Sequence, residues 1–182
     1  MRLDAAARWL QGVRRHPSPN HDPRPLGSAI DLLVVHAISL PPGQFGGSHI
    51  DALFTNRLDP RAHPYFESVC TLRVSAHVLI CRKGEVVQYV PFHRRAWHAG
   101  ESSFDGRAQC NDFSIGIELE GTENTPFEPI QYRRLADISR LLMVAYPGIT
   151  PARIAGHCDI APGRKWDPGP AFDWRYLHQL LR

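Results

Sequence analysis

The sequence predicts a single α/β domain in which one central mixed β-sheet is flanked by helices. An unbroken apolar run over residues 32–38 and an alternating apolar and polar pattern over 113–119 indicate strands. Apolar residues at helical spacing over 130–146, closed by Pro147 and Gly148, indicate a helix. Strands with helices before, between and after them are typical of one sheet covered by helices.

Length and composition limit the classes of protein that this sequence can represent. A chain of 182 residues can bury one full core, and no linker or repeat divides it, so we expect a single domain over residues 1–182. Lys and Arg number 21 against 18 for Asp and Glu, and no basic run occurs, so we expect no nucleic-acid partner. The composition leaves the oligomeric state open.

The N-terminal residues and the cysteines indicate a compartment. Asp4 and Arg8 interrupt the apolar stretch that a leader peptide needs, and no apolar run is long enough to span a membrane. We therefore expect a cytoplasmic protein without a membrane partner. The spacing of the four cysteines matches no paired-cysteine zinc motif, so we expect them to be reduced and mostly buried. They are Cys70, Cys81, Cys110 and Cys158.

The beginning of the chain is predicted to hold a helix, two loops and a buried strand. Residues 1–15 indicate a short amphipathic helix, and residues 16–25 indicate a proline-rich loop. The apolar run 32–38 suits a strand that is covered on both faces, and the breakers in 39–47 predict a loop after it. The apolar side of the helix would consist of Leu3, Ala6, Ala7 and Leu10.

Shorter elements are expected in the middle of the chain. Residues 57–66 indicate an irregular loop that follows a short helix. Segments 76–80 and 85–89 indicate two strands of a hairpin, joined by a turn at 82–84. The short helix is indicated by Ile50, Leu53 and Phe54.

The strand at 113–119 is followed by the helix at 130–146 and by the C-terminal segments. Because side chains alternate along a strand, the apolar residues of 113–119 share one face and the others share the opposite face. Residues 156–174 are expected to form a long loop before a terminal helix of about eight residues. The apolar face holds Phe113, Ile115, Ile117 and Leu119, and the opposite face holds Ser114, Gly116 and Glu118.

Two histidines and one aspartate are candidate metal ligands. His36 ends the buried strand, where α/β sheets place their sites, and His157 lies in the long loop ten residues before Asp167. Three nitrogen and oxygen ligands leave a fourth tetrahedral position open for water, which distinguishes a catalytic zinc site from a structural one. The spacing alone leaves open whether His36 meets His157, since most single histidines are simply hydrogen-bonded.

A lysine and a glutamate are candidates for the remaining chemistry. Lys165 is one of only two lysines and lies next to the candidate ligand segment, so it could stabilise an oxyanion; the alternative is an exposed loop lysine. Glu118 could take a proton from water, although Glu120 competes for that role. Gly116, on the same face as Glu118, would leave room for a substrate or a water molecule.

Five sequence blocks together resemble a known family. They resemble the cytoplasmic N-acetylmuramoyl-L-alanine amidases of peptidoglycan recycling, which belong with phage T7 lysozyme and the peptidoglycan recognition proteins. The resemblance runs from about residue 14 to the C-terminus and implies the α/β fold of that amidase family. The blocks are LLVVHAISLPPGQFGG, LRVSAHVLI, RAWHAG, CNDFSIGIELEG and GHCDIAPGRKWDPGPAFDW.

The resemblance also implies a catalytic zinc ion and the residues that serve it. His36, His157 and Asp167 would be the zinc ligands, and an Asp in the third position resembles the bacterial recycling branch. Glu118 would be the base that acts on the attacking water, and Lys165 would stabilise the oxyanion. Cys158 would then be packed rather than bound to the metal. The implied reaction is hydrolysis of the amide bond between N-acetylmuramic acid and L-alanine in soluble 1,6-anhydro-muropeptides.

The resemblance implies substrate contacts as well, and the chain departs from the family pattern nearby. Arg73 would pair with a carboxylate of the stem peptide, and Trp97 would lie against the sugar or the peptide, with core packing as the alternative for Trp97. Ala37 replaces an expected Asn, Gln109 replaces an expected Arg, and Trp166 replaces a smaller residue. The first two changes put individual substrate contacts in doubt.

Three other functions remain as alternatives. A non-catalytic binder of peptidoglycan fragments would have lost a zinc ligand, and all three stand here. A phage-type endolysin acting on intact cell wall would favour a ligand Cys and often an added wall-binding module. A structural zinc domain would normally use four ligands, often with cysteine pairs.

Overall fold

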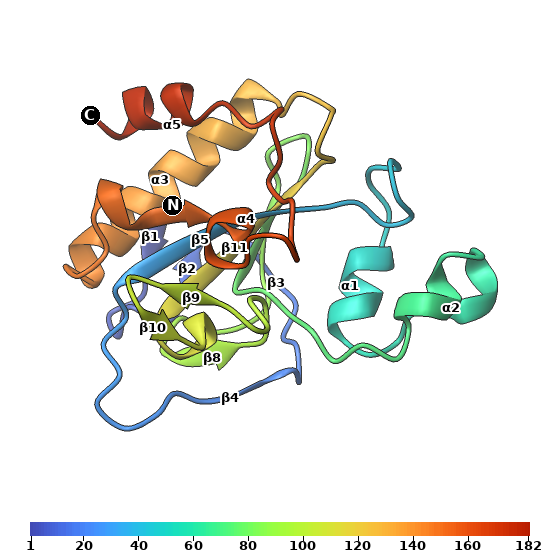
Figure 1. Ribbon diagram of the computed structural model, residues 1–182, viewed down its shortest axis with the longest axis horizontal. Helices are drawn as coiled ribbons and strands as arrows, with labels where there is room; N and C mark the ends of the chain where they lie inside the picture. Colours follow the sequence, from blue (N-terminus) through green and yellow to red (C-terminus); the bar gives the residue numbers. More distant parts are fainter.

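A six-stranded mixed sheet lies at the centre of the computed structural model, which describes residues 1–182 (Figure 1). The order across the sheet is β12, β5, β11, β6, β7, β3, with bounds Ile154–Gly156, Leu32–Ile38, Ser114–Glu120, Val78–Ile80, Val86–Gln88 and Arg14–Arg15. The first four strands are parallel to their neighbours, β7 is antiparallel to β6, and β3 is parallel to β7. The predicted mixed sheet is confirmed, as are the strand at 32–38 and the hairpin of β6 and β7.

Two helices cover one face of this sheet. The helices α3 (Pro129–Ala145) and α5 (Trp174–Leu181) contact each other and lie on the same side in Figure 1. The larger hydrophobic cluster forms beneath them from alternate residues of β5 and β11, namely Leu33, Val35, Ile115, Ile117 and Leu119. The period-two pattern of both strands therefore turns their apolar residues toward α3, and the two helices predicted from the sequence are confirmed.

Two short helices extend to one side of the sheet. The helices α1 (His49–Phe54) and α2 (Phe66–Val69) lie away from the main body on the right of Figure 1. Their apolar side chains form a second cluster with residues of the β6–β7 hairpin, such as Leu79 and Val87. The short helix expected around residues 50–54 is α1, whereas the predicted loop at 57–66 contains a 3₁₀ turn, Pro60–Ala62, and the first residue of α2.

The expected amphipathic helix at residues 1–15 is wrong. Strand β1 (Arg2–Leu3) instead pairs with β2 (Leu10–Gln11) in a hairpin. The side chain of Asp4 accepts a hydrogen bond from the backbone N–H of Arg8 at 2.7 Å, which closes the turn between them. The backbone N–H of Leu10 donates to Oε1 of Gln88 at 2.7 Å, so a tertiary contact to the sheet replaces the helical pairing.

Further short elements lie between the predicted strands and helices. Strand β4 (His21–Pro23) lies in the proline-rich segment and pairs with β8 (Arg94–Ala96). Strands β9 (Ser103–Phe104) and β10 (Arg107–Ala108) form another hairpin. The long segment 156–174 begins with the short helix α4, His157–Ile160. Further 3₁₀ turns are Cys110–Asp112 and Pro151–Arg153.

Cysteine burial differs from the expectation. All four cysteines are free thiols, but only Cys110 is buried, and the other three are partly exposed. As for membrane association, none of the helices combines the length and the apolar character that crossing a bilayer requires.

Candidate active site

The site is built on the face of the sheet opposite α3. In the parallel pairing of β5 with β11, His36 lies opposite Glu118 in register. Because side chains alternate along each strand, the face that turns Val35 and Ile117 toward α3 turns His36 and Glu118 the other way. His36 and Glu118 are far apart in the sequence but are neighbours on the paired strands β5 and β11.

The other two candidate ligands reach His36 from the opposite side. Strand β12 pairs with β5, with Gly156 opposite Val35, so the next residue, His157, begins α4 beside His36. The backbone N–H of Cys158 donates to the carbonyl oxygen of Asp167 at 2.8 Å, which holds the returning chain next to α4. His36, His157 and Asp167 are all buried, and the structure brings them together.

The three ligand atoms form a compact triangle. Nδ1 of His36 lies 3.0 Å from Nδ1 of His157, and each of these nitrogens lies 3.1 Å from Oδ2 of Asp167. Ligands about 2.0–2.1 Å from a tetrahedral zinc ion lie roughly 3.3 Å from one another, so the observed triangle is close to the size that such an ion needs. Two imidazoles and one carboxylate are also ligands that zinc binds in proteins, so these three residues fit a zinc ion.

Burial and the contacts within the triangle shift the pKa values of two of these ligands, His36 and Asp167. Burial lowers the pKa of His36 to about 4, even though the neighbouring Asp167 acts in the opposite direction, so this imidazole is neutral at pH 7. Burial would raise the pKa of Asp167, but its close contacts with His157 and His36 together hold that pKa below its ordinary value. A neutral imidazole and an ionised carboxylate are the forms that bind a metal ion.

Glu118 lies beside this triangle with one oxygen unused. Its side chain is only 9% exposed, and its buried Oε2 has no hydrogen-bond partner. Burial, and then the charge of Asp167, raise the pKa of Glu118 well above its ordinary value. A buried polar atom without a partner is costly in an ordinary core, so an unpaired carboxylate at this position indicates a group with a functional partner.

Glu120, the competitor of Glu118, is fully engaged elsewhere. Its Oε1 accepts a hydrogen bond from the backbone N–H of Gly46, and its Oε2 accepts one from the backbone N–H of Arg82 at 2.9 Å. The carboxylate therefore joins the loop after β5 to the turn of the β6–β7 hairpin. Of these two carboxylates, only Glu118 lines the cleft and has a buried oxygen without a partner.

These residues open into one cleft of about 500 Å³. Lys165 is exposed at its rim, and Trp97, which is half-buried, also lines it. Arg73 does not line the cleft; it is exposed, and its guanidinium donates to the carbonyl oxygen of Thr71 at 3.3 Å. The lining includes His36, Trp97, Glu118, His157, Lys165 and Asp167.

The space predicted above Gly116 is not available to a substrate. The ring of His98 fills it, because a Cβ added to Gly116 would lie 2.4 Å from Cγ of His98. Sequence reasoning missed His98 as a member of the site, although it follows Trp97 in the block RAWHAG. A glycine that faces a site residue on a buried strand was the available signal, since glycine in a strand often marks a close approach.

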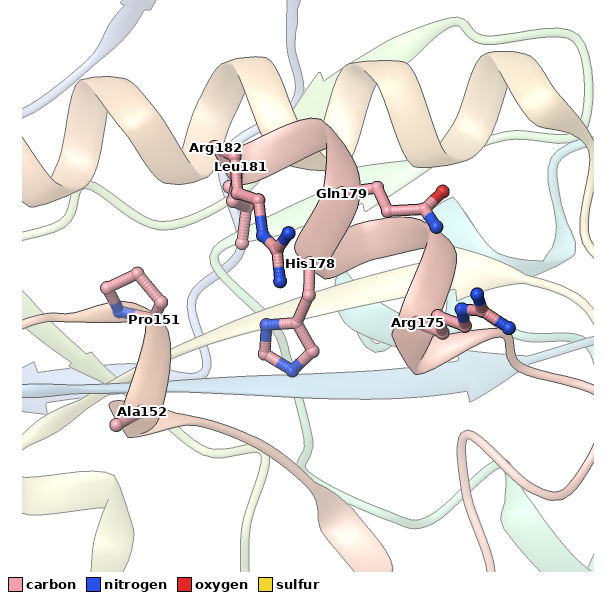
Figure 2. Close-up of a pocket in the computed structure, with 7 residues that line it drawn as sticks. All are labelled: Pro151, Ala152, Arg175, His178, Gln179, Leu181 and Arg182. Atoms are coloured by element: carbon pink, nitrogen blue, oxygen red, sulfur yellow. The ribbon is translucent and has the colours of Figure 1, made fainter.

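A second hollow lies beside α5, and its lining shares no residue with this cleft. Figure 2 shows its lining, in which the polar side chains are those of Arg175, His178, Gln179 and Arg182. Its volume is about 640 Å³, but it contains none of the predicted site residues and no group of three metal-ligating side chains. The chemistry is therefore concentrated in the cleft over the sheet.

Comparisons with known proteins identify the family of this chain. The family model of N-acetylmuramoyl-L-alanine amidases matches residues 26–170. The 1,6-anhydro-N-acetylmuramyl-L-alanine amidase AmpD of Escherichia coli (strain K12) is 61% identical over 173 residues, which cover 95% of this chain and 94% of that protein. These matches define the class as a hydrolase that acts on an amide bond. The chain belongs to the N-acetylmuramoyl-L-alanine amidase family.

Solved structures show the same fold. A crystal structure of a selenomethionine AmpD derivative matches with a TM-score of 0.96 and 57% identity, and it covers 100% of both chains. A complex of the amidase AmiD from E. coli with anhydro-N-acetylmuramic acid-L-Ala-D-gamma-Glu-L-Lys matches with a TM-score of 0.60 and 30% identity. That match covers 95% of this chain and 60% of the other. The expected amidase fold, a mixed sheet flanked by helices, is confirmed.

Proposed function

We propose that this chain hydrolyses the amide bond between 1,6-anhydro-N-acetylmuramic acid and L-alanine in soluble muropeptides, with one zinc ion as cofactor. The observation that carries the proposal is the triangle of His36, His157 and Asp167 beside the unpaired carboxylate of Glu118. A bound zinc ion would lower the pKa of water and polarise the scissile carbonyl. The proposal treats residues 1–182 as one catalytic domain.

Each of the remaining residues has a stated task in this reaction. Glu118 takes the proton of the attacking water, and its raised pKa makes it a stronger base than an exposed carboxylate. Lys165, at the rim of the cleft, donates a hydrogen bond to the carbonyl oxygen as negative charge develops on it. Glu118 then returns the proton to the leaving amine of L-alanine, so the acid and the base are the same carboxyl group.

Two further side chains, those of Trp97 and Arg73, are assigned to substrate binding. Trp97 lines the cleft and offers an aromatic surface to the sugar or to the peptide. Arg73 lies outside the cleft lining in this structure, so we assign it only to the distal carboxylates of the stem peptide, which extend beyond the reacting bond.

Relatives support the choice of substrate. The E. coli relative is named a 1,6-anhydro-N-acetylmuramyl-L-alanine amidase, and the AmiD complex contains an anhydro-muramyl peptide. We assign the reaction to the recycling of such fragments in the cytoplasm, a reducing compartment that suits four free thiols. An intact-wall amidase is the alternative that the substrate comparison below tests.

The proposal is tested by the products formed from two substrates. We expect the protein to convert anhydro-muramyl-tripeptide to the free sugar and the free tripeptide, and to leave intact sacculi largely uncleaved, as measured by mass spectrometry. Treatment with a chelator should abolish the reaction, and added zinc should restore it. The reason is that His36, His157 and Asp167 cannot lower the pKa of water without the metal ion. Undiminished turnover by the metal-free protein would contradict the zinc mechanism, and a preference for sacculi would contradict the recycling role.

A further inference from the structure

A line of hydrogen-bonding groups runs from the candidate ligand His36 into the interior. Nε2 of His36 lies 2.9 Å from Nδ1 of His98, and Nε2 of His98 lies 3.2 Å from Oγ of Ser114. The hydroxyl of Ser114 donates in turn to the carbonyl oxygen of Cys110 at 2.6 Å. Apart from the cleft edge of His98, which is 9% exposed, the three side chains are essentially inaccessible to solvent.

The last member of this line determines the direction of every hydrogen bond in it. The carbonyl oxygen of Cys110 can only accept, so the single hydroxyl proton of Ser114 points toward it. Oγ of Ser114 is then an acceptor for Nε2–H of His98, which leaves Nδ1 of His98 as a lone pair. That lone pair accepts from Nε2–H of His36, so the proton of the neutral His36 ring lies on the nitrogen away from the ligand triangle.

Packing holds His98 in this position. Its ring lies against Gly116 of β11, where a Cβ would be 2.5 Å from Nδ1 and 2.4 Å from Cγ. Ser114 and Gly116 are alternate residues of the same strand and point to the same face, so one strand supplies both the acceptor and the flat surface for the ring. The missing side chain of Gly116 thus makes room for a residue of the protein.

The second histidine ligand is arranged in the same way, but by a shorter route. Nε2 of His157 donates directly to the carbonyl oxygen of Ala99 at 3.0 Å, which leaves its Nδ1 as a lone pair in the triangle. His36 has no backbone carbonyl at that distance, and its ring contacts His98 instead. Both imidazoles are therefore oriented by a backbone carbonyl, one directly and the other through two side chains.

The tautomer of His36 matters because the triangle contains a competing acceptor. Oδ2 of Asp167 lies 3.1 Å from Nδ1 of His36, so a proton on that nitrogen would be stabilised by the carboxylate. Such a proton would occupy the lone pair that a metal ion needs. Without an acceptor at Nε2, the ring would favour this blocked form.

We propose that His98 is a positioning residue that keeps the lone pair of His36 Nδ1 directed at the metal ion, with Ser114 and the carbonyl of Cys110 fixing the direction of the hydrogen bonds. The inference rests on the proposed function, since it assigns a role toward the proposed zinc ion. His98 contacts no metal ligand other than His36, and it takes no part in the proton transfers assigned to Glu118.

The affinity of the metal-free protein for zinc tests this role. We expect His98→Phe, which keeps a ring but lacks an acceptor, to bind zinc about 10–100-fold more weakly, as is usual when a partner of a metal-bound histidine is removed. His98→Gln retains a side-chain oxygen that can accept from His36, so its affinity should stay within about threefold of the wild type. Ser114→Ala should fall between the two. Competition with a chromophoric chelator measures these affinities without any turnover assay.

Ser139→Ala is the matched control for Ser114→Ala, because Ser139 is equally buried but lies on α3, on the opposite face of the sheet from the candidate ligands. Its zinc affinity should equal that of the wild type, and circular dichroism should show native secondary structure in all variants. Wild-type affinity in a folded His98→Phe, or an equal loss in His98→Gln, would overturn the inference. A wild-type protein that binds no zinc would instead overturn the proposed function together with it.

A spectroscopic readout covers the case in which His98→Phe does not fold. In the zinc-loaded wild type we expect a proton on Nε2 of His36 and a ¹⁵N–¹⁵N coupling across its hydrogen bond to Nδ1 of His98. Absence of that coupling, or a proton on Nδ1 of His98, would overturn the inference. The measurement uses the intact protein and is independent of the variants.

Discussion

Among individual residues, Glu118 is distinguished from the neighbouring Glu120 by its hydrogen bonding. Its Oε2 is buried without a partner, while the neighbouring Glu120 uses both of its oxygens. The two carboxylates are two positions apart on β11 and share a face, so the strand pattern alone does not separate their roles. Hydrogen-bond occupancy separates them, because a base needs an oxygen that is free to accept a proton.

Glu118→Gln should keep the metal and lose turnover. The amide is nearly the same size but cannot accept a proton, so we expect kcat to fall about 10²–10⁴-fold. Zinc content, measured by mass spectrometry of the protein, should remain at one ion per chain. Glu101→Gln, at an exposed position outside the cleft, should leave both values unchanged. Substantial activity in Glu118→Gln would remove this residue from the mechanism.

Among the elements, the loop at 39–47 and the β6–β7 hairpin are joined by a single side chain. Glu120 lies at the end of β11 and accepts hydrogen bonds from backbone N–H groups of both segments, at Gly46 and Arg82. Several residues of this loop line the cleft, so its position affects the access of substrate.

Glu120→Ala should destabilise the protein and loosen this loop. Two partly buried N–H groups lose their acceptor, so we expect the free energy of unfolding to fall by about 1–3 kcal/mol. Urea denaturation measures the change, and Glu101→Ala, at an exposed position, should shift the value by less than about 0.5 kcal/mol. A similar small effect for both variants would show that the Glu120 contacts add no stability.

For the whole molecule, the buried histidines make stability depend on pH. His77 lies in the interior, where its Nδ1 accepts from the backbone N–H of Gly116. Burial, and then the charge of Arg24, lower the pKa of His77 well below 6.5. In the unfolded chain this ring takes up a proton below about pH 6.5, whereas in the folded protein it stays neutral. The unfolded state therefore binds more protons as the pH falls, and the free energy of unfolding decreases.

His77→Gln should weaken that dependence. One proton difference corresponds to a slope of up to about 1.4 kcal/mol per pH unit, and the variant should lose this contribution between pH 6.5 and pH 5.5. Urea denaturation of the metal-free wild type and variant over this range measures both slopes, so that the other buried histidines contribute equally to each. Identical slopes would contradict the assignment of a neutral, buried His77.

Local patterns were sufficient to predict the main strands and helices. The apolar run at 32–38 and the helix at 130–146 agree with β5 and α3 within one residue at either end. The alternation in 113–119 also predicted that Glu118 faces away from the apolar core, because side-chain direction along a strand depends only on neighbouring residues. The prediction of an N-terminal helix was wrong because the conformation of this segment depends on a distant contact. The backbone N–H of Leu10 donates to the side chain of Gln88, which is far away in the sequence.

The sequence alone was thus enough for the fold class, the family and the residue types of the site. Its blocks contain His36, Glu118, His157, Lys165 and Asp167, but the distances between them in the sequence say nothing about where they meet. Only the tertiary structure decided that β5 pairs with β11 in the register that sets His36 opposite Glu118, and that His98 occupies the space above Gly116. Register and close packing are contacts between distant segments, and they depend on how the whole sheet is hydrogen-bonded.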